Sequence, residues 1–210
     1  MNRTIKTHLG KAGFVSRIAH SALTNAASLF AGLAVLVLGA CSEAKFDYSS
    51  QKVRFSFNNA VYQDATLQSA LNPMSPGVFC RIYEGMEGIS RYFYFESNQG
   101  LTSRKKATAE DTRRTCIIGV YNKTGIIVGY GNLSSPAPLY AYDSQCPNCY
   151  AEKGTPSFKL SLDPKGIATC PTCKRTYDLN NNGITANGDK LMKYRASCTD
   201  PLGLLSVVNN

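Results

Sequence analysis

Four cysteines in two pairs are the residues of this chain whose type and spacing best fit a chemical site. They stand in Cys146-Pro-Asn-Cys149 and Cys170-Pro-Thr-Cys173, with twenty residues between the pairs. A Cys-x-x-Cys turn directs two sulfur atoms the same way, and two such turns that face each other complete a tetrahedron of thiolates. The sequence therefore predicts a metal site formed by Cys146, Cys149, Cys170 and Cys173, in loops 146–149 and 170–173.

Four thiolates leave several occupants open. Zinc is the first expectation, because four sulfurs at about 2.3 Å close its coordination shell and make the site structural. A single iron in the same tetrahedron could carry one electron, and an all-cysteine [2Fe-2S] cluster is also chemically allowed. Disulfides within or across the pairs are the remaining alternative in an oxidising compartment. A thioredoxin-like redox role is not expected, because neither pair is predicted to open a helix.

Histidine is almost absent from the chain. His8 and His20 are the only two, and both lie in a segment that we expect to be removed. Without a histidine base, serine hydrolases and most cysteine proteases are excluded, and no spaced carboxylate pair or phosphate-binding glycine loop is present. We therefore expect no enzyme, and at most a non-catalytic electron carrier.

The first forty residues have the composition of a targeting segment. Four basic residues and no acidic one precede and enter an apolar run that ends at Leu38-Gly-Ala-Cys41. This ending resembles the lipobox of bacterial lipoproteins, a likeness that implies cleavage before Cys41 and acylation of that cysteine, palmitate included. Residues 1–40 would then be a signal peptide and 41–52 a lipidated tether. The alternatives are a simple secretory signal or a transmembrane helix.

The charge of the remaining chain is modest. The whole sequence has 23 basic and 14 acidic residues, and the leader holds four of the basic ones, which leaves a net charge of +5. A lipid-anchored domain with this charge is expected beside an anionic membrane, not on nucleic acid. We expect a cell-envelope protein. The outer membrane is weakly favoured over the inner one, because Ser42 stands at the position where lipoproteins of enteric bacteria that stay in the inner membrane have an aspartate. Its protein or redox partner is left open.

Short apolar segments recur along residues 53–208, which we interpret as one β domain. Apolar alternation or β-branched and aromatic enrichment predicts strands at 53–57, 77–83, 92–95, 116–121, 125–130, 139–142, 158–162, 166–169 and 191–194. Segments 116–121 and 125–130 read as a hairpin. One short helix is expected at 64–71, with Asp64 as its cap. The pattern predicts an all-β, antiparallel sandwich or small barrel with at most one short helix.

The second half of the chain resembles a Rieske ferredoxin domain. In that family a strand enters each of two ligand loops, and an aromatic-Asp-Leu turn, a glycine and a Leu-x-x-Tyr strand follow. The matching segments are Tyr140–Cys149, Gly166–Cys173, Tyr177-Asp-Leu179, Gly188 and Leu191–Tyr194. The likeness implies a Rieske-like fold with an iron-sulfur cluster. However, Cys149 and Cys173 stand where the family has histidines, so a histidine-ligated centre is excluded.

Three further cysteines lie outside the two pairs. Cys80 and Cys116 are each placed on an apolar strand face, where they could form a disulfide or remain buried thiols. Cys198 has no evident partner. Basic residues also gather at 104–106 and 113–114; this loop could meet lipid head groups or an acidic partner, but a solvated charge run is the simpler interpretation.

Overall fold

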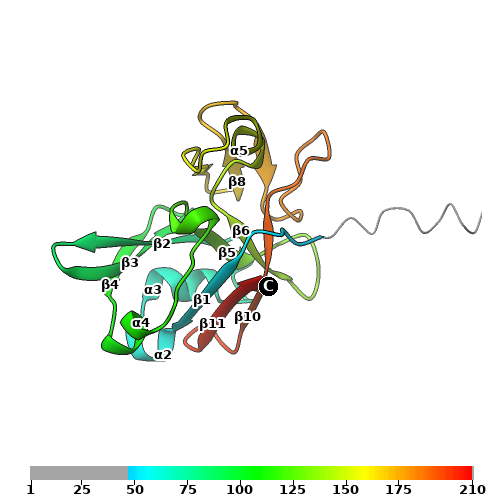
Figure 1. Ribbon diagram of the computed structural model, residues 1–210. Helices are drawn as coiled ribbons and strands as arrows, with labels where there is room; N and C mark the ends of the chain where they lie inside the picture. The colour runs from blue at the N-terminus through cyan, green and yellow to red at the C-terminus, as the bar shows by residue number, and fades with distance from the viewer. Residues whose placement is uncertain (1–46, 210) are drawn as a thin grey trace, which may run out of the picture. The chain divides into compact units, whose positions relative to one another are not determined.

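The computed structural model describes residues 47–209. The predicted signal peptide and the predicted lipidation site, Cys41, lie outside these described residues. Within 47–209, helices are all too short to cross a lipid bilayer. Figure 1 shows the arrangement of the elements.

An eight-stranded antiparallel sheet, curled into a half-barrel, forms the larger part of the fold, as the sequence predicted for an all-β protein. The strands follow the order β1-β11-β10-β6-β5-β2-β3-β4 across the sheet. Their bounds are β1 Val53–Asn58, β2 Phe79–Glu87, β3 Ser90–Ser97, β4 Thr102–Lys106, β5 Ile126–Tyr130, β6 Leu139–Asp143, β10 Lys193–Cys198 and β11 Leu204–Asn209.

A second sheet of three short strands is inserted between two neighbours of the first. The chain leaves the large sheet after β6 and returns to it in β10, which pairs with β6. The intervening residues form helix α5 (Pro147–Lys153) and strands β7 (Ser161–Leu162), β8 (Ile167–Thr169) and β9 (Thr176–Asp178). Figure 1 places α5 and β8 together, away from α2 and α4. We call residues 144–192 the inserted lobe.

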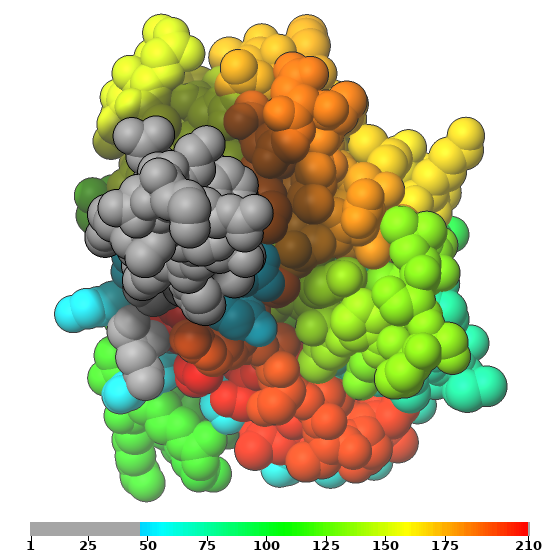
Figure 2. All heavy atoms as spheres, turned by 90° about the vertical axis from the view of Figure 1, so that its right-hand side faces the viewer, coloured from blue at the N-terminus to red at the C-terminus, as the bar shows by residue number. Residues whose placement is uncertain are grey.

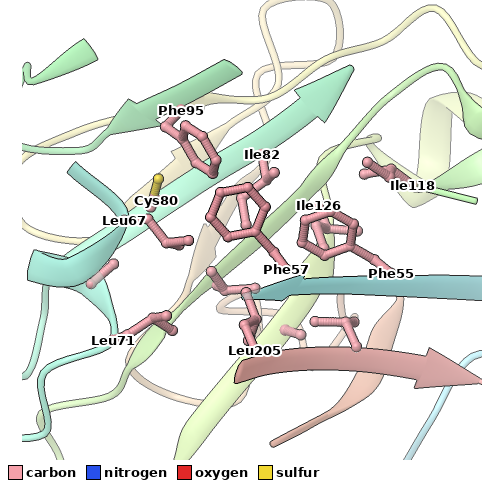
Figure 3. Close-up of a cluster of buried hydrophobic side chains, with 14 of the residues drawn as sticks. Phe55, Phe57, Leu67, Leu71, Cys80, Ile82, Phe95, Ile118, Ile126 and Leu205 are labelled. Atoms are coloured by element: carbon pink, nitrogen blue, oxygen red, sulfur yellow. The ribbon is translucent and has the colours of Figure 1, made fainter. Parts of the chain in front are cut away.

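Two apolar clusters correspond to these two parts. The larger one lies inside the curl of the main sheet, where inward residues of β1 meet β2, β3 and β11. Figure 3 shows the Phe57 ring among Ile82, Phe95 and Ile126. Phe57 packs edge-on against Phe95 at 5.1 Å between ring centroids. Burial of such rings stabilises the half-barrel.

The smaller cluster joins the inserted lobe to the back of the main sheet. Phe79 and Ile127 of the large sheet contribute to it, and so do three cysteines of the two pairs. Its other buried members are Tyr142, Leu160, Ala168, Tyr177, Leu179 and Leu191. Figure 2 shows the lobe as yellow and orange surface above the orange-red surface of residues near the C-terminal end of the described range. The lobe therefore packs around a small core that it shares with the back of the main sheet, and three of the cysteines are part of it.

Short helices are more numerous than expected. The structure has α2 (Asn59–Tyr62), α3 (Ala65–Ala70), α4 (Ala109–Arg113), α5 and the 3-10 turn η1 (Val120–Asn122), where at most one helix was expected. The predicted one is α3, and Asp64 caps it by accepting from Leu67 N at 2.9 Å. Of the others, α2 and α4 are single turns capped by the Asn58 and Thr108 side chains, whereas α5 and η1 have no side-chain cap. Apolar periodicity cannot detect such short elements.

The predicted hairpin of 116–121 with 125–130 is wrong. Only the second segment is a strand, β5, and it pairs with β2 and β6. Ile117 instead bridges Arg54 of β1 through two backbone hydrogen bonds of 2.9 and 3.0 Å. The polar stretch that follows β3 also contains a strand, β4, and the final strand β11 was not predicted.

Residues 47–52 lie against the domain, although the sequence suggested a free tether there. Asp47 forms ion pairs with Lys190 and Lys193, the first at 3.6 Å. The Asn209 side chain donates to the carbonyl groups of Ser49 and Gln51. The part of the tether inside the described residues is therefore docked on β10 and β11.

Candidate metal centre

The first cysteine pair opens a helix, which corrects the expectation that neither pair does. Cys146 is the N-cap of α5, Pro147 follows in the first turn, and Cys149 lies one turn along. Proline suits the first helical position because it has no N–H to leave unpaired. Residues three apart on a helix share one face, so the two sulfur atoms point the same way.

The second pair lies in the tight turn between β8 and β9. The Cys170 amide donates to Arg175 O, and the Lys174 amide donates to Cys170 O, both at 2.9 Å. Lys174 takes the left-handed conformation with φ of 61°. That residue reverses the chain, so Cys170 and Cys173 face the opening of α5.

The four sulfur atoms converge, as the sequence predicted. All four Sγ atoms lie within 4.8 Å of one another. The two contacts across the pairs are Cys146 to Cys173 and Cys149 to Cys170, each 3.7 Å between Sγ atoms. Four sulfurs at about 2.3 Å from a tetrahedral ion stand about 3.8 Å apart along each edge of the tetrahedron. The group could therefore hold one metal ion.

Burial differs among the four ligands. Cys146 and Cys170 are fully buried and Cys149 is nearly so, whereas Cys173 is exposed. The site is thus closed on the side of the lobe core and reaches solvent only through Cys173. A closed four-sulfur shell leaves no open position for a substrate.

Burial also sets the ionisation of the thiols. Burial raises the pKa of Cys146 and of Cys149. It acts on Cys170 in the same sense, but hydrogen bonds from the backbone of Cys173 and Thr172 outweigh it and lower the Cys170 pKa to about 7. A bound cation deprotonates the thiols that ligate it. Ligation of a metal would therefore have to release protons from the buried thiols of Cys146 and Cys149.

Tyr177 is the side chain that most directly supports the cluster. Its hydroxyl lies 3.5 Å from Cys146 Sγ, and the ring is fully buried in the lobe core. A hydrogen-bond donor beside a ligating sulfur fixes the ligand and moderates its charge. Tyr177 belongs to the aromatic-Asp-Leu segment of the sequence, but its contact with the sulfur was not predicted.

Asp143 anchors the first loop to the main sheet. Its buried carboxylate accepts from Tyr194 Oη at 2.7 Å, from Thr124 Oγ1 at 2.8 Å and from the amides of Val120 and Gln145. The Gln145 side chain then accepts from Phe158 N at 3.0 Å. Sequence reasoning missed Asp143; the signal was an acidic residue that ends an apolar strand three residues before Cys146.

Two basic residues, Lys174 and Arg175, directly follow the second loop. Arg175 Nε lies 2.9 Å from the Asn148 amide of the first loop, which can accept from it. With the Asn148 amide turned so that its oxygen faces Arg175, this contact would link the two loops. Lys174 is exposed beside Cys173, while Lys153 pairs with Glu152 at 3.0 Å at the far end of α5.

The remaining cysteines do not join the centre. Cys80 is buried in the larger core and Cys116 packs at its margin, and both are free thiols. In the described residues the two thiols are unpaired, which is one of the two alternatives that the sequence left open. Cys198 is also free, and its sulfur contacts Asp200 O at 3.0 Å.

Comparisons with known proteins give no further guide. No family model, no curated protein and no solved structure matches the chain.

Proposed function

We propose that the protein is a lipid-anchored extracytoplasmic module in which Cys146, Cys149, Cys170 and Cys173 hold a structural zinc ion. The observation that carries the proposal is the convergence of the four sulfurs, all within 4.8 Å. A zinc site of this kind is worth about 10–16 kcal/mol of folding free energy in small peptides at neutral pH. The ion would join α5 to the β8–β9 turn and fix the tip of the inserted lobe as a rigid docking surface.

The spacing of the sulfurs favours one ion over a two-iron cluster. In a [2Fe-2S] centre two thiolates ligate each iron, and two irons with bridging sulfides separate the pairs. Here the shortest contacts, 3.7 Å, run between the two loops, from Cys146 to Cys173 and from Cys149 to Cys170. The cluster leaves room for a single ion at its centre.

The same distances argue against disulfides. A disulfide joins its sulfurs at about 2.0 Å. The two closest pairs stand at 3.7 Å, and all four cysteines are free. Thiols that lie at the edge length of a tetrahedron are instead arranged as ligands.

A single iron in the same position is the second candidate, and it would make the protein an electron carrier. One observation favours it: Cys173 is exposed, so one ligand sulfur reaches the surface. An electron could pass through that sulfur to a docked redox partner. The remaining ligands are buried, as a one-electron centre shielded from water requires.

We also propose that the protein has a lipid anchor in the membrane and that its domain is Rieske-like. Leu38-Gly-Ala-Cys41 after an apolar run supports lipidation at Cys41 in a bacterial envelope. For the Rieske relationship, the support is the Tyr140–Tyr194 signature and a lobe in which both ligand loops face one site. Several acyl chains would hold the module firmly at the membrane.

Elemental analysis of the protein purified without added metal tests the proposal. We expect one zinc per chain and a colourless solution; iron with visible absorption would select the second candidate. The variant Cys149→Ser should lose the metal and melt at a lower temperature, because a hydroxyl is a poor replacement for a thiolate. Cys198→Ser, which alters a free cysteine outside the site, is the matched control. Full stability and metal content in Cys149→Ser would reject the structural-metal role.

A further inference from the structure

A cavity with the features of a ligand site lies outside the four-cysteine cluster, at the open seam of the half-barrel. The segment 107–117 crosses this seam from β4 to β1 and is tied to β1 by the Arg54–Ile117 bridge. Beneath it is a cavity of about 330 Å³, a volume within the range of small-molecule sites. Its lining comprises Arg54, Ser56, Arg91, Phe93, Asp111, Arg114, Thr115 and Cys116.

Three guanidinium groups dominate the charge of this seam cavity. Arg54 is exposed, and its side chain has no hydrogen bond or ion pair with any residue of the 47–209 range. Arg114 pairs only with exposed Glu110, one helical turn away, and such surface pairs are weak. Arg54 is therefore free to bind an anion, and Arg114 would exchange its exposed pair with Glu110 for the anion.

The acidic residue of the lining does not neutralise these arginines. The Asp111 carboxylate accepts hydrogen bonds from Thr108 and from the Tyr62 hydroxyl, within the cap of α4. Arg91 contacts Asp111 only through the backbone carbonyl, and it lies 3.7 Å from Glu84. Glu84 and Glu110 pair with Arg91 and Arg114, so the unpaired positive charge at the seam cavity is that of Arg54.

The cavity also has an apolar wall. Arg91 lines the cavity, but its Nε is buried with almost no accessible surface and has no hydrogen-bond partner in the described part of the chain. That atom therefore does not face the cavity, although an unpaired buried donor is unfavourable. The Phe93 ring lies beside it, with the Arg91 guanidinium 5.6 Å from the ring centroid, and the Cys116 side chain adds further apolar surface.

We propose that the seam cavity binds a small organic anion that has a phosphate or carboxylate head and a short apolar tail. Arg54 and Arg114 would hold the head, since guanidinium groups bind such oxyanions in a two-pronged geometry. The tail would lie against Phe93. A second cavity of about 340 Å³ shares Arg54 and Thr115 and adds Lys52, so the site extends along β1 toward residue 47. This inference does not depend on the metal centre.

Two sources could supply this chemistry, an anionic lipid head group or a soluble metabolite. Isothermal titration of the whole chain with butyl phosphate, inorganic phosphate and butanol tests the site itself. We expect saturable binding of butyl phosphate, weaker binding of phosphate, and none of butanol. Vesicles of phosphatidylglycerol and of phosphatidylcholine then identify the source: Arg54-dependent binding to the former alone indicates a lipid, and its absence indicates a soluble ligand.

Arg54→Gln is the decisive variant, because its backbone pairing with Ile117 is retained while the guanidinium is lost. We expect butyl phosphate to bind about tenfold more weakly, the effect of losing one charge-assisted contact. Arg113→Gln is the matched control, because it removes the same charge from α4 without lining the cavity. Arg114→Gln gives an independent test if Arg54→Gln melts early. No saturable binding, equal effects of Arg54→Gln and Arg113→Gln, or butanol binding as tightly as butyl phosphate would overturn the proposal.

Discussion

At the scale of single residues, Tyr177 connects the lobe core to the proposed metal. Its hydroxyl contacts Cys146 Sγ at 3.5 Å. We predict that Tyr177→Phe keeps the fold but weakens zinc binding about tenfold, because groups that orient a metal ligand typically contribute that much affinity. Competition with a chromogenic chelator measures the change.

Tyr142→Phe is the control for that experiment. Tyr142 is also fully buried in the same cluster, and its hydroxyl donates to Leu179 O at 3.1 Å, not to a cysteine. Its loss should lower stability by about 1 kcal/mol, the net value of one hydrogen bond, with zinc affinity unchanged. If both variants weakened zinc binding equally, the Tyr177 contact would have no specific role.

The ligand residues were predictable from sequence and their supports were not. Two Cys-x-x-Cys pairs predict a metal site by their spacing alone, so ligands such as Cys146 and Cys173 could be identified without knowledge of the fold. Asp143 could not, because its partners Tyr194 and Val120 are distant in the sequence and meet it only through sheet pairing. Local pattern carries no information about such contacts.

At the scale of elements, α4 depends on one reciprocal cap. Asp111 accepts from Thr108 N at 2.9 Å, and the Asp111 amide donates to Thr108 Oγ1 at 3.2 Å. Asp111→Ala should lower the free energy of unfolding by about 1–2 kcal/mol, the usual value of a lost cap. Glu110→Ala, which removes only an exposed ion pair, should change it by less than about 0.5 kcal/mol. Urea denaturation at pH 7 measures both.

The Asp111 effect should depend on pH. Burial acts to raise its pKa, but hydrogen bonds from Thr108 and Tyr62 outweigh burial and lower the pKa below the ordinary value of 3.8. A carboxyl group with a lowered pKa stabilises the fold above its ordinary pKa, and this contribution is lost as the pH falls through the lowered value. The difference between Asp111→Ala and the parent should therefore shrink below about pH 4. A constant difference down to pH 2 would contradict this assignment.

Strands with alternating apolar residues were predictable, and elements defined by pairing or capping were not. Val53–Phe57 and the later segments that became β2, β3, β5 and β6 carried the signal. β4 is polar and lies at the sheet edge, where charged residues are usual, so it lacked that signal. Pro147 stands at the start of α5, a position where proline is common, but the Cys-Pro motif was interpreted as a turn and not as the start of a helix.

At the scale of the whole molecule, the two apolar clusters lead us to expect that the inserted lobe and the half-barrel respond differently to removal of the metal. The main core contains no predicted ligand, whereas the lobe core includes three of the four cysteines. After EDTA treatment, we expect hydrogen exchange to accelerate in α5, β8 and β9, because the ion that joins their loops is gone. Exchange in β1, β2 and β11 should stay slow.

A uniform increase over both sheets would contradict that expectation. It would mean that the lobe and the half-barrel unfold as one unit, despite the separate clusters. Protection unchanged everywhere would mean instead that no ion contributes to stability. Cys149→Ser, analysed without chelator, should reproduce the EDTA pattern if the ion is the cause.

Fold class was predictable from composition and spacing, but strand order was not. Frequent short apolar segments indicated an all-β protein, and the structure confirms it. The order β1-β11-β10-β6 brings the first and the last strand of the described residues together, and this depends on the pairing of β11 with β1, which lies far away in the sequence. Insertion of the cysteine lobe between paired β6 and β10 follows from the same non-local pairing.

X-ray absorption at the zinc edge tests the central claim most directly. The protein would be purified without added metal, so that any bound ion is the one it acquired on folding. We predict a single shell of four sulfur atoms at about 2.3 Å, supplied by the two cysteine pairs. Absence of zinc, a shell dominated by nitrogen or oxygen, or a second metal atom close to the first would contradict a structural four-cysteine zinc site.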